Sequence, residues 1–346
     1  MKICLFTILM LFALCARAEW VNPSEQYTNE YKNHESAKCP VVKDNIKHFV
    51  YFARDREGII NHPLLQSEHF AGAQIMYPWA KLEPNEGEYD FAQIESDLKY
   101  LQAHNKTLFI QLQDATFTTA FKAVPNYLMN DRYANGVTQQ FSDSGEAEGW
   151  VAKRWNKQVR AKFAELLYAL GEQFDGRVAG INLQESAIGV SAKTSADFSE
   201  EGYVEALKAN MSALKRGFKR SATIQYANFM PGEWLPWENK GYLKSIYEHG
   251  EQIGVGMGAP DLMPRRKGQL NHALAMMHEG EFSVPLSIAV QDGNYIGKTN
   301  SMELQSQRKN LVPGLVSFAK HFLKVDYMFW TNQAPYFEQD VMTCFD

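Results

Sequence analysis

Glu185 follows a short apolar run, Val178–Leu183, from which a single amide, Gln184, separates it. The run is typical of a buried strand, and a carboxylate at the end of such a strand is costly to place unless it faces a cleft, is paired or is used. A carboxyl group in a cleft can transfer protons as a general acid or base. Glu185 is therefore the first candidate for a catalytic residue, and a structural ion pair at a strand end is the alternative.

The other apolar runs of the chain end in carboxylates, amides, aromatic side chains and one arginine, without Cys or His. Amides and acids hydrogen-bond sugar hydroxyls, and Trp side chains stack on sugar faces. This composition favours a carbohydrate site. The residues that we expect to contact a substrate are Arg54, Trp79, Asp114, Gln184, Asn228, Asp261, Gln291 and Trp330.

Several other kinds of chemistry lack their motifs in this sequence. No His/Asp cluster has the spacing of metal ligands, no Gly-x-Ser-x-Gly turn indicates a serine hydrolase, and no glycine-rich loop could hold a phosphate. We therefore expect no metal and no cofactor. The formal net charge of −5 argues against a nucleic-acid partner held by phosphate contacts.

Strand-like runs alternate with helical stretches along the whole chain. Helical periodicity places one apolar face on residues 90–103 and another on residues 159–174. Eight Val-, Ile-, Phe- and Tyr-rich runs bounded by Gly, Pro and Asp fit parallel strands buried on both faces. This order and length predict one (β/α)8 barrel domain over residues 19–346. The predicted strands are His48–Ala53, Ala73–Tyr77, Thr107–Leu112, Val178–Leu183, Thr223–Tyr226, Ile253–Met257, Val284–Val290 and Tyr327–Trp330.

The gap between the third and fourth predicted strands is too long for a single helix. We predict an insertion over about residues 113–155, which contains aromatic residues, Pro125 and the turn sequence Asn135-Gly136. A long insertion at this place usually shapes the wall of an active site, and a mobile surface loop is the alternative.

The first eighteen residues have the pattern of a signal peptide. Lys2 gives a positive start, an apolar stretch follows, and Ala16-Arg17-Ala18 has the form of a cleavage site. A lipoprotein reading through Cys15 is the rival, but Leu14 fits it poorly. We expect a secreted or periplasmic protein with no membrane association after cleavage. Cys39 and Cys344 would remain, and in an oxidising compartment they predict one disulfide bond, with two separate buried thiols as the alternative.

The sequence also resembles a known group of enzymes. Trp79-Ala-Lys-Leu-Glu-Pro-Asn-Glu-Gly-Glu-Tyr-Asp-Phe91 resembles the segment after strand two of clan-A glycoside hydrolases, which are retaining β-glycosidases with a (β/α)8 barrel. Val124-Pro125-x-x-Leu128 and the segment from Phe174 to Glu185 continue the likeness. The resemblance spans most of the barrel, and its motifs are specific to the clan and not to a substrate.

The resemblance implies roles for individual residues. Glu185 matches the acid/base of the clan, although Gln184 stands where the clan has an Asn that contacts the sugar 2-hydroxyl. The clan's nucleophile is a Glu at the end of strand seven, where this chain has Gln291-Asp292, so Asp292 is the first candidate for the second carboxylate. Asp261 and Asp114 are further candidates. Trp330 matches the Trp that closes the sugar subsite.

These observations leave three functions open. The first is an exported glycoside hydrolase that cleaves a β-linked oligo- or polysaccharide with paired carboxylates. The second is a carbohydrate-binding barrel without catalytic activity, because the expected nucleophile is missing. The third is a polysaccharide lyase or another sugar-active barrel.

Two surface features have both a structural and a functional interpretation. Trp234 and Trp237 could line sugar subsites or pack the barrel rim. The cluster Arg265-Arg266-Lys267 is most simply a solvated loop, but beside a cleft it would favour a uronic or sulfated substrate.

Overall fold

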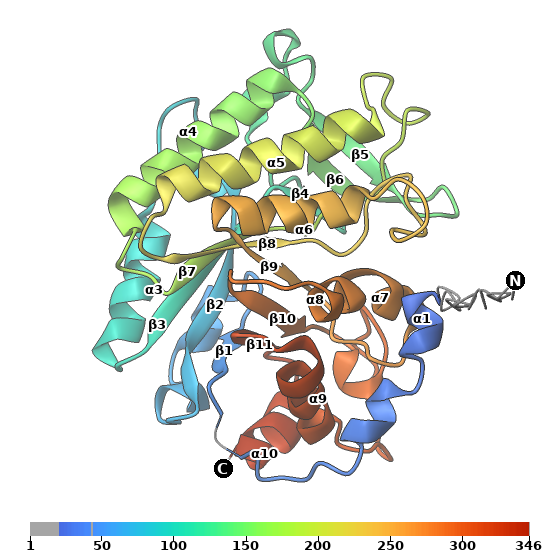
Figure 1. Cartoon of the computed structure of the whole chain (residues 1–346). Coiled ribbons are helices and arrows are strands. Elements are labelled where there is room, and N and C mark those ends of the chain that lie inside the picture. The colour runs from blue at the N-terminus through green and yellow to red at the C-terminus, as the bar shows by residue number, and fades with distance from the viewer. Residues whose placement is uncertain (1–20, 43, 346) are drawn as a thin grey trace, which may run out of the picture.

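The computed structural model describes residues 21–42 and 44–345, so the expected signal peptide at residues 1–18 lies outside the described residues. Eight parallel strands close into a barrel in the order β1-β11-β10-β9-β8-β7-β3-β2, with helices packed around it (Figure 1). The predicted (β/α)8 fold is confirmed. The barrel strands are β1 (Lys47–Tyr51), β2 (Phe70–Pro78), β3 (Thr107–Gln113), β7 (Gly180–Leu183), β8 (Ala222–Tyr226), β9 (Gly256–Ala259), β10 (Leu286–Val290) and β11 (Tyr327–Thr331).

Every predicted strand overlaps an observed one, but the prediction for the sixth, Ile253–Met257, began too early. Ile253 is the last residue of the preceding helix. Gly254 then adopts the left-handed conformation, with φ at 77°, and ends the helix, so that the strand begins only at Gly256. Ile253 is apolar as the last residue of an amphipathic helix that packs against the core, and not as the first residue of a strand.

Helices connect the strands, with one exception: only the short turns η2 and η3 lie between β1 and β2. The helices are α1 (Pro23–Gln26), α2 (Trp79–Leu82), α3 (Ala92–Ala103), α4 (Lys157–Phe174), α5 (Glu200–Gly217), α6 (Tyr242–Ile253), α7 (Lys267–Gln269), α8 (Ala275–Glu279), α9 (Val312–Phe318) and α10 (Thr343–Phe345). The short 3-10 and π turns are η1 (Glu30–His34), η2 (Arg56–Ile59), η3 (Pro63–Leu65), η4 (Asn126–Leu128), η5 (Asp131–Tyr133), η6 (Leu270–Leu274), η7 (Asn294–Ile296), η8 (Ala319–Leu323) and η9 (Phe337–Met342).

The apolar core has two parts, as strands buried on both faces require. A larger layer lies between the barrel and its helices. The smaller part fills the barrel interior, where Phe49, Phe109 and Phe329 pack edge to face or tilted against one another. Above these rings the interior is polar. There the buried Gln74 amide donates to Asn182 Oδ1 across 2.9 Å. The interior is therefore a closed core below a polar mouth.

Two glycines allow α4 and α5 to lie against each other. A Cβ atom on Gly171 would stand 2.1 Å from the Gly217 carbonyl oxygen, and one on Gly217 would stand 2.6 Å from the Leu167 carbonyl oxygen. Only glycine permits backbones to approach this closely. This contact fixes α4, which precedes β7, against α5, which follows it, and Glu185 lies just after the end of β7.

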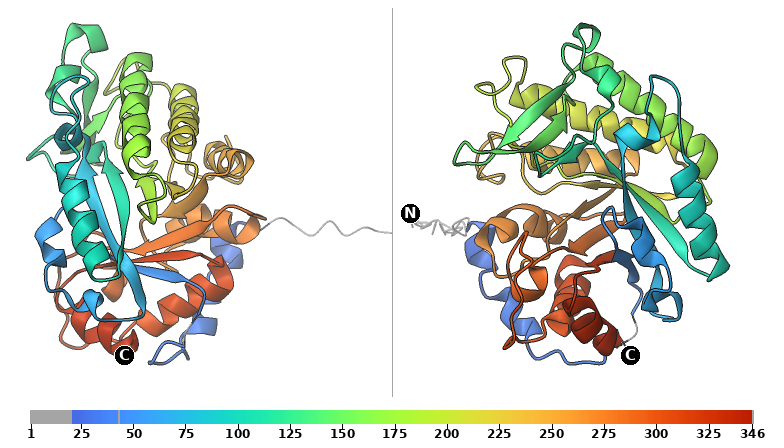
Figure 2. Two further views of the ribbon diagram at one scale, coloured as in Figure 1. Left: turned by 90° about the vertical axis from the view of Figure 1, so that its left-hand side faces the viewer. Right: turned by 180° about the vertical axis from the view of Figure 1, so that it is seen from behind.

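The predicted insertion contains a small antiparallel sheet of order β4-β6-β5, formed by β4 (Ala115–Thr116), β5 (Val137–Phe141) and β6 (Ala147–Ala152). The β5–β6 hairpin, green in Figure 2, stands outside the closed barrel. The first strand of the small sheet, β4, directly follows β3 and Asp114, so the insertion begins at the carboxyl end of a barrel strand, where barrel enzymes place their sites.

The two ends of the described chain are joined covalently. Cys39 and Cys344 form a disulfide bond with an S–S distance of 2.07 Å, as the sequence predicted. The Val41 backbone N–H donates to the Cys344 carbonyl oxygen beside it. None of the helices in the described ranges is long and apolar enough to cross a membrane.

Candidate functional site

Glu185 lies at the carboxyl end of β7 and is only partly exposed. Asn228, which follows β8, donates its amide N–H to Glu185 Oε2 across 2.6 Å. Burial raises the pKa of the Glu185 carboxyl to about 7, the Asn228 hydrogen bond opposes this rise, and the charge of Asp261 adds to it. A carboxyl group with this pKa can be protonated or ionised near neutral pH, as a general acid or base requires.

A buried ion pair holds the backbone of Glu185. Arg154 binds Asp114 through two hydrogen bonds of 2.7 Å, and both side chains are about 4% exposed. The Arg154 guanidinium also donates to the Glu185 carbonyl oxygen across 2.9 Å and to the Tyr203 hydroxyl across 2.7 Å. Tyr203 in turn donates to the Ser186 carbonyl oxygen. Arg154 lies in the insertion, so this segment fixes the position of the candidate acid.

Gln184 connects the ends of two barrel strands. Its side-chain oxygen accepts hydrogen bonds from the backbone N–H groups of Asp114 and Ala115, at 2.8 and 2.7 Å. The extra methylene that distinguishes Gln from Asn thus carries the amide across to the end of β3. Sugar contact by Gln184 and Asp114 stays a prediction, and in this structure their oxygens are engaged by the protein.

Two further carboxylates lie at the ends of neighbouring strands. Asp261, after β9, accepts from the Asn294 amide across 3.0 Å, and burial raises its pKa. Asp292, after β10, accepts from the Thr331 hydroxyl across 3.2 Å, and burial raises its pKa too. The charge of Asp292 raises the pKa of Asp261, and that of Asp261 raises the pKa of Glu185. Asp261 is therefore linked electrostatically to each of the other two carboxyls.

The inner cavity is a space of about 380 Å³ that Glu185 and Asp261 both line. Asn228 stands between them in chain order and lines it as well, whereas Asp292 is not among its lining residues. The remaining lining residues come mostly from the loops after β9 and β10: Ala187, Phe229, Arg266, Lys267, Gly268, Gln269, Thr299 and Asn300. Of the three candidates for a second carboxylate, Asp261 is thus the one that shares a cavity with Glu185.

An outer groove of about 1350 Å³ adjoins the inner cavity, and Ala187, Phe229 and Gly268 line both. One wall is the β5–β6 hairpin of the insertion, and the other is the loop after β8. Two aromatic side chains of the groove stand out, Trp234 in the loop after β8 with 72% and Phe117 directly after β4 with 46% of its surface exposed. Large aromatic rings are seldom this exposed without a partner, and they are suited to stacking on sugar rings.

Two predicted substrate contacts need correction. Trp79 is fully buried, with its indole N–H on Glu83 at 2.7 Å, and Trp330 is fully buried, with its indole N–H on His48 at 3.1 Å. Neither ring has a free face on which a sugar could stack. The exposed Trp234, which the sequence left open between a subsite and the barrel rim, lines the groove instead.

Arg54 and Gln291 lie at strand ends on the β1 and β10 side of the mouth. The exposed Arg54 guanidinium stacks over the Phe121 ring at 4.1 Å, and the half-buried Gln291 donates its backbone N–H to Asn294. Tyr51, the last residue of β1, is a residue that the sequence did not indicate. Burial raises the pKa of its hydroxyl, and the charges of Tyr226, Asp292 and Glu185 raise it further. Substrate contact by Arg54 and Gln291 stays a prediction.

The residues that the sequence missed could not be found from their neighbours in the chain. Arg154 lies 31 residues before Glu185, and Tyr203 lies 17 residues after Ser186, the neighbour of Glu185. Both side chains reach the site only through folding. No group of three or more His, Cys, Asp or Glu side chains within residues 21–42 and 44–345 could hold a metal ion.

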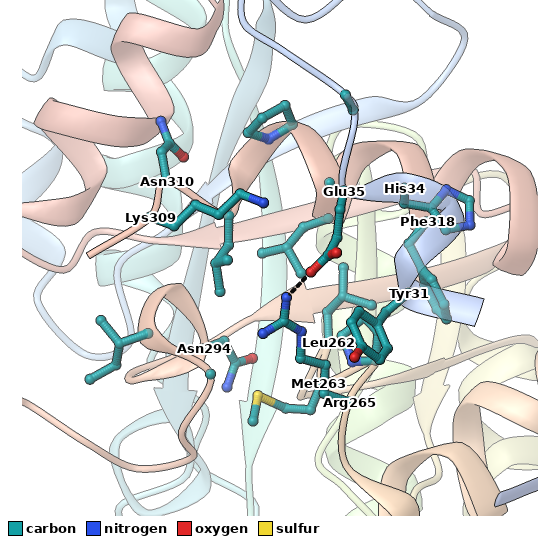
Figure 3. Close-up of a pocket in the computed structure, with 18 residues that line it drawn as sticks. Tyr31, His34, Glu35, Leu262, Met263, Arg265, Asn294, Lys309, Asn310 and Phe318 are labelled. Atoms are coloured by element: carbon teal, nitrogen blue, oxygen red, sulfur yellow. Dashed lines mark hydrogen bonds and ion pairs between the residues drawn. The ribbon is translucent and has the colours of Figure 1, made fainter. Parts of the chain in front are cut away.

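A second cavity, of about 220 Å³, lies apart from Glu185 (Figure 3). The N-terminal segment around Tyr31 and Glu35, the loop after β9 and α9 enclose it. In it the Arg265 guanidinium forms an ion pair with Glu35 and stacks over the Tyr31 ring. None of the predicted site residues lines this cavity.

No family model and no curated protein matches the chain. Among solved structures it is similar to the catalytic domain of β-amylase from Paenibacillus polymyxa, at 9% identity and a TM-score of 0.57, over 88% of this chain and 100% of that one. It is also similar to the lactosyl-enzyme intermediate of endo-glycoceramidase II from Rhodococcus sp., at 8% identity and a TM-score of 0.50, over 85% of this chain and 75% of that one. At such identities the likeness concerns the fold, and the (β/α)8 barrel of this chain is the one that these glycoside hydrolases share.

Proposed function

We propose that the protein is a glycoside hydrolase that acts on an oligo- or polysaccharide, with Glu185 as its general acid. One observation carries the proposal: Glu185 opens into a cavity beside Asp261, and its carboxyl has a pKa of about 7. A pair of carboxyl groups, one of them protonated near neutral pH, is the requirement of glycoside hydrolysis. The barrel fold shared with glycoside hydrolases supports the proposal.

The proposed reaction needs only these residues and water. Protonated Glu185 donates its proton to the glycosidic oxygen while the bond from that oxygen to the anomeric carbon breaks. The second carboxylate can attack the anomeric carbon and form a glycosyl-enzyme bond, which a water molecule then hydrolyses while Glu185 takes up the proton of that water. Alternatively, it accepts a proton from a water molecule that itself attacks the anomeric carbon. Asn228 holds Glu185 Oε2, so that Oε1 is left for the substrate.

Asp261 is the second carboxylate in this proposal, in place of Asp292. Asp261 lines the inner cavity, its charge acts on Glu185, and the Asn294 amide fixes its orientation. Asp292 lies one strand further, where it accepts from the Thr331 hydroxyl, and its charge raises the pKa values of Tyr51 and Asp261. The shape of the outer groove, with Trp234 and Phe117 exposed on its walls, supports a substrate longer than one sugar.

Turnover of a panel of aryl glycosides and oligosaccharides tests the proposal. We expect Glu185→Gln to lose activity by a factor of about 10² or more on unactivated substrates, since general acid catalysis contributes this much. Glu146 is an exposed glutamate in the turn of the β5–β6 hairpin, and Glu146→Gln should keep full activity. Wild-type protein that binds glycans without cleaving any of them would instead establish a carbohydrate-binding barrel.

A second experiment separates the two aspartates. We expect Asp261→Asn to abolish turnover and Asp292→Asn to reduce it only modestly. Proton NMR of the first product formed by the wild type shows whether the anomeric configuration is retained or inverted, which tells whether the second carboxylate attacks carbon or activates water. The opposite ranking of the two variants would transfer the role to Asp292.

We also propose that the protein is exported and works outside the cytoplasm. The leader-like sequence of residues 1–18 and the disulfide bond between Cys39 and Cys344 support this location. Mass spectrometry of the protein from its natural host should find a mature N-terminus at Glu19. An intact Met1 on a protein in the cytoplasmic fraction would refute the proposal.

A further inference from the structure

We propose that the inner cavity recognises a sugar unit with an anionic group, a carboxylate or a sulfate ester, which Arg266 and Lys267 bind. The inference rests on the proposed function in taking the ligand to be a carbohydrate. It goes further by naming the chemical class of that carbohydrate and the two residues that select it.

The geometry places both cations in the cavity that holds the candidate acid. Arg266 and Lys267 line the same space of about 380 Å³ as Glu185 and Asp261. The Arg266 guanidinium donates to the Thr299 hydroxyl across 2.6 Å, so the loop after β10 holds a side chain of the loop after β9 in place. A guanidinium held in this way presents its remaining N–H donors in the planar arrangement that suits carboxylate and sulfate groups.

Arg266 and Lys267 share the cavity with two carboxyls, and the charge of Arg266 lowers the pKa of Asp261 without an ion pair between them. Within the described part of the chain, neither Arg266 nor Lys267 forms an ion pair, whereas their neighbour Arg265 pairs with Glu35 in the separate cavity of Figure 3. Two cations therefore stand opposite two carboxyls. Because burial raises the pKa of Glu185 to about 7, that group is largely protonated in slightly acidic solution, and Asp261 alone opposes the two positive charges. An anionic ligand would restore the balance.

The remaining surface of the cavity suits the neutral part of a sugar. Asn228, Gln269, Thr299 and Asn300 line it with amide and hydroxyl groups, which can donate to and accept from ring hydroxyls. The outer groove has the opposite character, with Asp143 and Glu148 on its rim beside exposed aromatic rings. The anionic unit is therefore assigned to the inner cavity, next to Glu185.

Binding of matched methyl β-glycosides tests the inference without requiring turnover. The probes carry a hydroxymethyl group, a carboxylate or a 6-sulfate on the same ring, each in the gluco, galacto and manno configurations, and NMR titration gives their dissociation constants. We expect at least one anionic probe to bind roughly 10- to 100-fold more tightly than its neutral counterpart, as one or two charge-assisted hydrogen bonds provide. The carboxylate and sulfate arms identify the anion.

Two double variants with the same change in charge locate the effect. Arg266→Gln/Lys267→Gln should remove the preference for the anionic probe and leave the affinity for the neutral probe within about twofold. Arg265→Gln/Lys309→Gln changes one Arg and one Lys in the cavity of Figure 3 and should retain the preference. Equal affinity of the wild type for all probes, or equal losses in both double variants, would overturn the inference.

The outcomes for the two proposals are distinguishable. Preferential binding of an anionic probe without hydrolysis of any glycoside supports the inference and refutes the hydrolase. Hydrolysis of neutral substrates with no preference among the probes supports the hydrolase and refutes the inference.

Discussion

The Asn228 amide donates to Glu185 Oε2 across 2.6 Å, and this contact joins the ends of two neighbouring barrel strands. The amide favours the ionised carboxylate, whereas burial favours the protonated form and is the stronger influence. The acidity of Glu185 therefore depends on a residue that is itself only 2% exposed.

Removing the donor should raise the pKa of Glu185 above its value of about 7, because the ionised form loses its hydrogen bond. We expect the basic limb of the pH–activity profile of Asn228→Ala to move to higher pH. Asn239→Ala, an exposed amide in the outer groove, should leave the limb unchanged. A limb displaced to lower pH in Asn228→Ala would contradict the assignment.

Arg154→Met should destabilise the fold by about 3–5 kcal/mol, because Asp114 would be left as a buried carboxylate without a partner. It should also lower kcat by about 10²-fold, since a displacement of Glu185 by 1 Å has an effect of this size. Urea denaturation and steady-state kinetics measure the two effects. The double variant Arg154→Met/Asp114→Leu should recover much of the stability but not the activity, and strict additivity would argue against coupling.

The sequence predicted the barrel because its strands are apolar on both faces and because each strand end carries a turn residue or a polar side chain. For the same reason it predicted that Glu185 lies at the carboxyl end of a barrel strand. It could not predict that Trp79 and Trp330 are buried, since the type of a residue does not tell which way its ring points. Nor could it predict that Arg154 contacts Asp114, because the two residues are 40 positions apart and meet only in the folded chain.

The raised pKa of Glu185 has a consequence for stability. A carboxyl whose pKa rises from 4.5 to about 7 on folding binds more protons in the folded state between these pH values. The contribution of this carboxyl to the free energy of unfolding is fully present below about pH 4.5 and is lost as the pH rises through about 7. The total change is about 3 kcal/mol at most. The free energy of unfolding of Glu185→Gln, measured relative to that of the wild type, should therefore be higher at pH 8 than at pH 4. Parallel pH–stability curves from urea denaturation would rule this out.

The disulfide bond between Cys39 and Cys344 closes a loop with a sequence separation of 305 residues. Since a cross-link restricts the unfolded chain more when the loop is long, its loss should destabilise the protein by roughly 4–5 kcal/mol. Cys39→Ser/Cys344→Ser and the reduced wild type should show the same lowered denaturation midpoint. A wild type whose midpoint does not respond to a reductant would show that the bond contributes nothing to stability.

Trp234 should contribute to binding and not to stability, because 72% of its surface is exposed on the wall of the outer groove. A stacked aromatic ring contributes about 1 kcal/mol, so Trp234→Ala should weaken the binding of long oligosaccharides by about fivefold. Monosaccharide glycosides in the inner cavity should bind as before, and the free energy of unfolding should change by less than about 0.5 kcal/mol. Titration of Trp234→Ala with oligosaccharides of increasing length measures the loss of affinity, and an equal loss for short and long ligands would place Trp234 outside the path of the glycan.

Trp79→Phe provides the contrast, since it removes the indole donor from buried Glu83 and should destabilise the fold by about 1–3 kcal/mol.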